Sequence, residues 1–154
     1  MPRSPRWAHG IAALQRDEFD KALDTDEPYR AFQERVNAHR DELHRLVNQL
    51  KSKGKSIHVY GASTKGNTIL QWCGIDHRVI DCAADRNPDK HGAYTLGTNI
   101  PIVSEEESRA RRPDYYLVLP WHFRKEFVER ERAMIEQGVG LIFPLPTIEV
   151  VRGP

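Results

Sequence analysis

Cysteine is scarce in this sequence, and neither sign of charge is in excess. Its two cysteines, Cys73 and Cys82, are too few for a disulfide framework and form no CxxC, so no metal site is expected. We expect both thiols to be reduced and mostly buried. Twenty-three Lys and Arg against 22 Asp and Glu leave a net charge of +1, which gives no support to a nucleic acid as partner.

Long apolar runs are also missing. No stretch approaches the ~20 apolar residues of a membrane helix, so we expect no membrane partner. The opening MPRSPRWAHG lacks the apolar core of a secretory signal, and we therefore expect a cytoplasmic location. The 154 residues, 39% hydrophobic and 29% charged, suffice for one soluble domain with one core.

The N-terminal part divides into two segments. Residues 1–25 are predicted to be a lead-in or linker, with a possible short helix over 11–23. At residue 26 a domain begins that extends to residue 154: Asp26 and Glu27 precede Pro28, the order typical of a helix start. Apolar residues then recur with helical spacing, which predicts a long helix over 28–53.

Strands and helices alternate from Ile57 onward. Short apolar runs bounded by turn residues predict strands over 57–61, 78–85, 101–104, 115–120, 140–146 and 148–151. Helices are predicted between them: one that ends at Gly74, one that opens on the capping box of Ser104 and Glu107, and one over 122–137. The alternation predicts an α/β fold, a Rossmann-like parallel sheet of about five to six strands flanked by helices and preceded by the long helix.

Polar segments follow three of these strands, at the sheet edge where such folds bind ligands. The first is a turn of small and polar residues before a helix, which suits a phosphate because backbone N–H groups are exposed there. It comprises Gly61, Ala62, Ser63, Thr64, Lys65, Gly66 and Asn67. It matches neither GxGxxG nor GxxxxGK[ST], and a well-capped tight turn without a ligand is the alternative.

The other two segments are shorter. Asp85 ends a strand roughly 20 residues after the turn, the offset of a ribose-binding carboxylate, and Arg86 beside it suits a phosphate. A solvated loop with an Asx turn at Asn87 is the alternative. Trp121 and His122 follow the strand over 115–120 and are candidates for stacking and hydrogen bonding, although Trp packing and His capping explain them slightly better. No pattern in the sequence specifies a catalytic residue.

These segments carry a family resemblance. YGASTKGNTILQWCGI (60–75), DRNPDKHGAYTLGTNIPIVSEEE (85–107), PDYYLVLPWHF (113–123) and LIFPLPTIEVV (141–151) resemble the C-terminal domain of the S-adenosylmethionine-dependent sugar-nucleotide C-methyltransferases. The resemblance covers about residues 28–151. It implies a deoxysugar nucleotide, often a thymidine diphosphate 4-keto sugar, held between this domain and a central methyltransferase domain, with methylation beside the ketone after a base removes the proton.

The resemblance also implies what other domains supply. Complete members carry a cysteine-rich zinc-binding region and a methyl-donor domain whose motifs this sequence lacks, so no cofactor is expected on this domain alone. We therefore expect a sugar-nucleotide-binding part of a methyltransferase, not catalytic alone, whose partner is a catalytic domain in cis or in trans. Two alternatives remain open: a separate nucleotide- or CoA-binding Rossmann module, and a non-catalytic protein-interaction domain.

Overall fold

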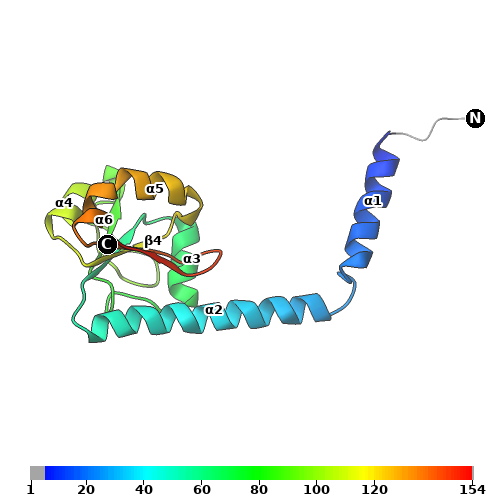
Figure 1. Cartoon of the computed structure of the whole chain (residues 1–154), viewed down its shortest axis with the longest axis horizontal. Coiled ribbons are helices and arrows are strands. Elements are labelled where there is room, and N and C mark those ends of the chain that lie inside the picture. Colours follow the sequence, from blue (N-terminus) through cyan, green and yellow to red (C-terminus); the bar gives the residue numbers. More distant parts are fainter. Residues whose placement is uncertain (1–5, 154) are drawn as a thin grey trace, which may run out of the picture. The chain divides into compact units, whose positions relative to one another are not determined.

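The computed structural model describes residues 6–153. They form two compact units, and the boundary between the units along the chain falls within one helix. The first unit ends at Ala38 and contains α1 (Arg6–Asp20) and the first half of α2 (Glu27–Ser52). Both predicted N-terminal helices are therefore present (Figure 1). Residues 1–5 of the predicted lead-in lie outside the described residues, and the boundary at residue 26 stays a prediction.

The second unit, from His39 on, is built on a six-stranded sheet of order β3-β2-β1-β4-β5-β6. The strands are β1 (Ile57–Tyr60), β2 (Cys82–Asp85), β3 (Ile102–Ser104), β4 (Tyr115–Val118), β5 (Gly140–Phe143) and β6 (Glu149–Val151). All neighbours pair in parallel except β5 and β6, which are antiparallel. The predicted α/β class is confirmed. The strand order reverses between the adjacent strands β1 and β4, which is the switch point where such folds bind ligands.

Helices cover both faces of this sheet. Because side chains alternate along a strand, Ile57 and Val59 of β1 face one side, while His58 and Tyr60 face the other. The second half of α2 and α3 (Thr64–Trp72) pack on the first side, through Leu43, Val47 and Leu70 among others. On the second side lie α4 (Glu105–Ala110), α5 (Arg124–Arg130) and α6 (Arg132–Glu136) (Figure 1).

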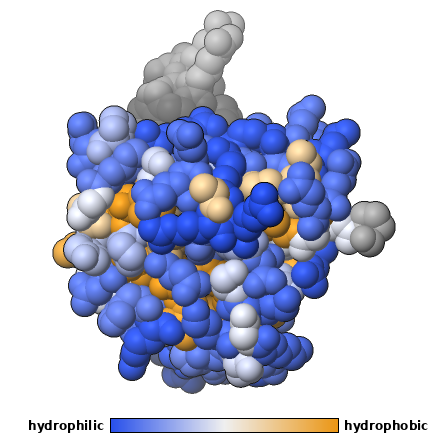
Figure 2. Space-filling model, turned by 90° about the vertical axis from the view of Figure 1, so that its left-hand side faces the viewer, coloured by the Kyte–Doolittle hydropathy of each residue, from blue (hydrophilic) through white to orange (hydrophobic). Residues whose placement is uncertain are grey.

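One face of the molecule is mostly hydrophilic (Figure 2). Figure 2 shows a face on which hydrophilic residues predominate and apolar ones are visible mainly in recesses between them. Among residues 6–153 no helix is both long and apolar enough to cross a membrane.

Two predicted elements differ from the structure. The strand expected over 78–85 begins only at Cys82, because the backbone N–H groups of Val79 and Ile80 both donate to Asp76 in a turn instead of joining the sheet. The helix expected over 122–137 is divided into a short 3₁₀ turn (Trp121–Phe123), α5 and α6. Glu131 lies at the break between α5 and α6, and its carboxylate is buried.

Candidate functional site

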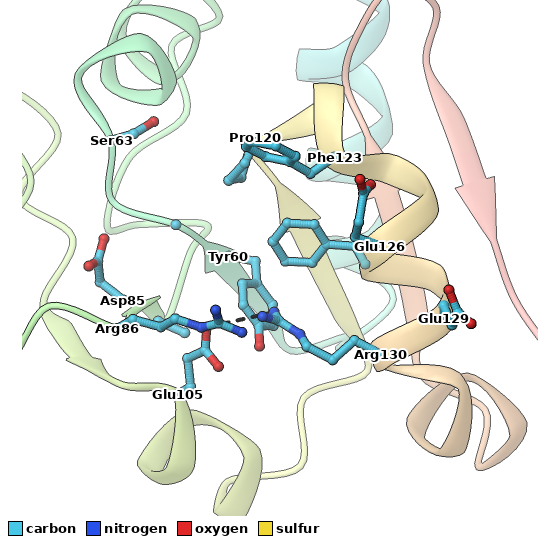
Figure 3. Close-up of a pocket in the computed structure, with 13 residues that line it drawn as sticks. Tyr60, Ser63, Asp85, Arg86, Glu105, Pro120, Phe123, Glu126, Glu129 and Arg130 are labelled. Atoms are coloured by element: carbon cyan, nitrogen blue, oxygen red, sulfur yellow. Dashed lines mark hydrogen bonds and ion pairs between the residues drawn. The ribbon is translucent and has the colours of Figure 1, made fainter.

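A pocket opens at the carboxyl ends of β1, β2 and β4, with a cavity volume of about 710 Å³ (Figure 3). We call it the strand-end pocket. Its lining comes from the ends of the strands, the start of α4 and the inner side of α5: Tyr60, Gly61, Ser63, Ala84, Asp85, Arg86, Glu105, Pro120, Phe123, Glu126, Phe127, Glu129 and Arg130. Cavities of this size accommodate ligands as large as nucleotides.

The turn after β1 forms one wall of the pocket and is closely packed. Gly61 has φ +88°, and a Cβ there would lie 2.8 Å from Cγ of Pro120. A Cβ on Gly66 would lie 2.5 Å from Cδ1 of Leu119. Only glycine therefore lets the turn and the start of α3 pack against the segment after β4. The Ser63 hydroxyl accepts a hydrogen bond from Gly66 N at 3.1 Å and caps α3.

Asp85 joins this turn to the end of β2. Its Oδ2 accepts hydrogen bonds from Ala62 N at 2.9 Å and from Nζ of Lys90 at 3.0 Å, and its Oδ1 accepts one from Asn87 N. Lys90 Nζ also donates to the Ala62 carbonyl at 2.9 Å. The carboxylate is therefore engaged in holding two loops together, whether or not a ligand hydroxyl also binds to it.

A cluster of arginines and glutamates lies at the lower end of the pocket, and three of its members, Arg86, Glu105 and Arg130, line the pocket. Glu105 accepts hydrogen bonds from Nε of Arg86 and Nη2 of Arg109, each at 3.1 Å, and lies 3.6 Å from Nη2 of Arg130. Glu131, only 4% exposed, accepts hydrogen bonds from Arg109 Nη2 and Arg130 Nε, each at 2.8 Å. Such paired and hydrogen-bonded carboxylates are stable in a buried position.

Tyr60 links this cluster to the sheet. Its hydroxyl donates to Oε1 of Glu131 at 2.8 Å and accepts a hydrogen bond from Arg109 at 2.6 Å. Burial, together with the hydrogen bond to Glu131, raises the pKa of the Tyr60 hydroxyl well above its usual value. The phenol therefore stays protonated and acts as a neutral donor at the base of the pocket.

Apolar side chains gather in the upper part of the pocket, beside the carboxylate of Glu126 (Figure 3). Phe123 is 50% exposed, and Phe127 packs edge-on against Tyr60 with ring centroids 4.9 Å apart. Figure 3 shows Pro120 and Phe123 together above Tyr60, on the side opposite Arg86 and Glu105. The pocket thus offers an apolar surface at one end and guanidinium groups at the other.

The sequence-predicted residues are divided between the pocket and its surroundings. Gly61, Ser63, Asp85 and Arg86 line the pocket. The others lie outside its lining: Ala62, Thr64, Lys65, Gly66, Asn67, Trp121 and His122. Of these, Trp121 packs partly against the core, whereas Thr64, Lys65 and His122 are exposed. A ligand contact remains a prediction for every residue of the set.

Sequence reasoning missed Glu105, Phe123 and Arg130. Glu105 was counted only as part of a capped helix start, and in the structure Ser104 does cap α4, because Glu107 N donates to its hydroxyl at 3.0 Å. Arg130 and Phe123 lie within the helix predicted over 122–137, and no motif in the sequence marks them. The signal available in the sequence was position, because α4 begins directly after β3, and the 3₁₀ turn and α5 follow β4.

The residues present do not fit a zinc ion. Among residues 6–153 no group of three or more His, Cys, Asp or Glu side chains is placed to hold a metal ion. Cys73 and Cys82 are both buried and free, and burial raises the pKa of the Cys73 thiol to about 11. A protonated, buried thiol is a poor metal ligand and a poor nucleophile.

Two comparisons with known proteins agree with each other. A family model described as "C-methyltransferase C-terminal domain" matches residues 3–146. The chain is 33% identical over 141 residues to "C-methyltransferase NovU" of Streptomyces niveus, an alignment that covers 92% of this chain and 34% of that relative. The chain thus spans about a third of the length of the relative. With its strand-end pocket and its matched sequence, the chain belongs to the C-methyltransferase C-terminal domain family.

Proposed function

We propose that the strand-end pocket holds the sugar-nucleotide substrate of a C-methyltransferase, a thymidine diphosphate deoxysugar. The observation that carries this proposal is the pocket itself, which lies at the carboxyl ends of β1, β2 and β4 and combines an apolar end with arginines. An apolar wall suits a base or a deoxygenated sugar, and guanidinium groups suit phosphates. A cytoplasmic location is part of the proposal.

In this proposal the domain binds and orients the substrate, and another domain carries out the chemistry. The methyl donor S-adenosylmethionine belongs to that catalytic domain, which acts in cis or in trans, and the zinc ion belongs to a separate cysteine-rich region. The relative's greater length supports this division, because about two-thirds of it has no counterpart in this chain. The domain alone therefore binds a nucleotide without methylating it.

Phe123 is the residue we assign to the nucleobase. Its ring is half exposed at the apolar end of the pocket, and the ring of His122 packs against it with centroids 4.3 Å apart. Stacking of a base on an aromatic ring contributes about 1–3 kcal/mol. Phe123→Ala is thus expected to weaken nucleotide binding about tenfold, while Phe32→Ala, which removes an exposed ring in the first unit, leaves it unchanged.

The test is calorimetric titration of the full chain with thymidine diphosphate, a thymidine diphosphate deoxysugar and coenzyme A. Saturable binding of the thymidine nucleotides, weakened by Phe123→Ala, supports the proposal. Tighter binding of coenzyme A would indicate a CoA module instead. Heat from none of the three would contradict nucleotide binding and favour a protein-interaction domain.

A further inference from the structure

Three guanidinium groups surround the Glu105 carboxylate, and two of them, those of Arg86 and Arg130, line the strand-end pocket. Arg86 reaches Glu105 from the end of β2, and Arg130 reaches it from α5, on opposite sides of the pocket (Figure 3). Arg86 is 68% exposed on its side chain, and within residues 6–153 its only hydrogen bond is the one from Nε to Glu105. Its two terminal nitrogens therefore keep donors for a ligand.

The charges of this cluster do not balance. Three arginines, Arg86, Arg109 and Arg130, share two carboxylates, those of Glu105 and Glu131. Three positive and two negative charges leave an excess of one positive charge. Like charges held close together repel each other, and the repulsion is relieved when an anion binds between them.

The remaining acids of the pocket do not supply that negative charge. Asp85 is paired with Lys90 at 3.0 Å. Glu126 and Glu129 are exposed on α5, and Figure 3 shows their carboxylates directed away from the guanidinium groups of Arg86 and Arg130. Within the cluster the excess positive charge is thus shared among three arginines, of which Arg86 and Arg130 line the pocket.

Arg130 is held in place before any ligand arrives. Its guanidinium lies 4.6 Å from the ring centroid of Phe127 and 5.1 Å from that of Tyr60, and its Nε donates to buried Glu131. Stacking and a charge-assisted hydrogen bond both reduce the freedom of the side chain. Binding of an anion to Arg130 therefore costs little additional side-chain conformational entropy.

We propose that Arg86 and Arg130 bind the diphosphate group of the pocket's ligand, and that Glu105 is the counter-ion whose place the diphosphate takes. The identity of the ligand as a nucleotide rests on the proposed function above, whereas the anion site rests on the arginines alone. The inference differs from the expectation that the turn after β1 holds the phosphate. In that turn Ser63 already accepts from Gly66 N, and Lys65 lies outside the pocket lining.

The test titrates the full chain and four variants with inorganic pyrophosphate, thymidine diphosphate and thymidine. Arg86→Gln and Arg130→Gln are each expected to weaken binding of the two diphosphates about tenfold, the loss of one charge-assisted hydrogen bond, and to leave thymidine binding unchanged. Arg111→Gln is the matched control, because Arg111 pairs with Glu107 outside the pocket and its loss removes the same charge. Lys65→Ala tests the turn.

The outcomes distinguish a failure of the arginine site from a failure of the nucleotide proposal. If pyrophosphate binds through the arginines while thymidine diphosphate binds no better, the anion site stands and the nucleotide proposal fails. If thymidine diphosphate binds tightly but only Lys65→Ala weakens it, the nucleotide proposal stands and the arginine site is wrong. Because Arg130 also contacts Glu131, Arg86→Gln decides the question if Arg130→Gln does not fold. Failure of wild type to bind either diphosphate overturns both proposals.

Discussion

The hydroxyl of Tyr60 donates to Oε1 of Glu131 at 2.8 Å, across the break between α5 and α6. The two residues are 71 positions apart in the chain. Their contact ties the central strand to the helices that form one wall of the pocket. Arg109 and Arg130 donate to the same oxygen of Glu131, so the carboxylate is the point at which β1, α4 and α5 meet.

Removing the charge of Glu131 is expected to destabilise the fold more than removing the hydroxyl of Tyr60. Glu131→Gln leaves Arg109 and Arg130 without a charged partner at Glu131, but both arginines are partly exposed, so we expect a loss of about 2 kcal/mol in unfolding free energy. Tyr60→Phe removes one hydrogen bond and is expected to cost about 1 kcal/mol. Urea titrations of the two variants measure both values. Equal costs would contradict the ranking.

Glu105→Gln is expected to strengthen anion binding. The substitution removes the negative charge that a diphosphate displaces, and the amide oxygen still accepts a hydrogen bond from Arg86. We expect pyrophosphate to bind several-fold tighter and the salt dependence of binding to steepen. Glu107→Gln, which removes a carboxylate paired with Arg111 on the same helix, is the control. Weaker binding by Glu105→Gln would show that its charge positions the arginines instead of competing with the ligand.

Two glycines with similar φ angles allow the cost of backbone strain to be compared with the cost of a steric clash. Gly61 has φ +88° and would place a Cβ 2.8 Å from Pro120, whereas Gly92 has φ +82° and no atom within 4 Å of such a Cβ. Gly92→Ala is expected to cost about 1 kcal/mol from the strained φ alone. Gly61→Ala is expected to cost about 2 kcal/mol more, since Pro120 must move. Equal thermal shifts for the two variants would refute the close approach.

The sheet could be predicted from the sequence, whereas the wall of the pocket that α5 forms could not. Strands such as Tyr115–Val118 are continuous apolar runs between turn residues, and this local signal gave the alternation, the fold class and the segments at the strand ends. Arg130 belongs to the site because the helix breaks at Glu131, which turns its carboxylate inward to Tyr60 and both arginines. That break follows from a contact between distant residues, and no local pattern in 122–137 indicates it.

The three strand-end segments show the same limit on a smaller scale. Their positions were correct, because parallel strands bring their carboxyl ends to one edge. Which side chain of each segment faces the pocket depends on turns that the sequence does not specify. Asn87 accepts a hydrogen bond from Asp89 N, as the Asx-turn alternative expected, and Phe123 lines the pocket while Trp121 packs partly into the core.

His58 is expected to make the stability of the fold dependent on pH. Its Nδ1 is 2.8 Å from the hydroxyl of Ser108, which in turn lies 2.9 Å from the hydroxyl of Tyr116, all within the core. Burial lowers the pKa of His58 from 6.5 to about 4, an effect that Asp81 opposes and that Arg111 and Lys51 reinforce. His58 is therefore neutral in the folded chain near neutral pH.

The unfolded chain takes up a proton at His58 below about pH 6.5, whereas the folded chain does so only near pH 4. The unfolding free energy is therefore expected to fall as the pH drops through this window, with a slope from His58 approaching about 1.4 kcal/mol per pH unit. His58→Gln removes this contribution, so its unfolding free energy changes less with pH even if it is lower throughout. His77→Gln, a substitution at an exposed histidine, is the matched control. Urea titrations at steps of about half a pH unit between about pH 4.5 and pH 7 measure the slopes. Parallel curves for wild type and His58→Gln would show that His58 is not the group responsible.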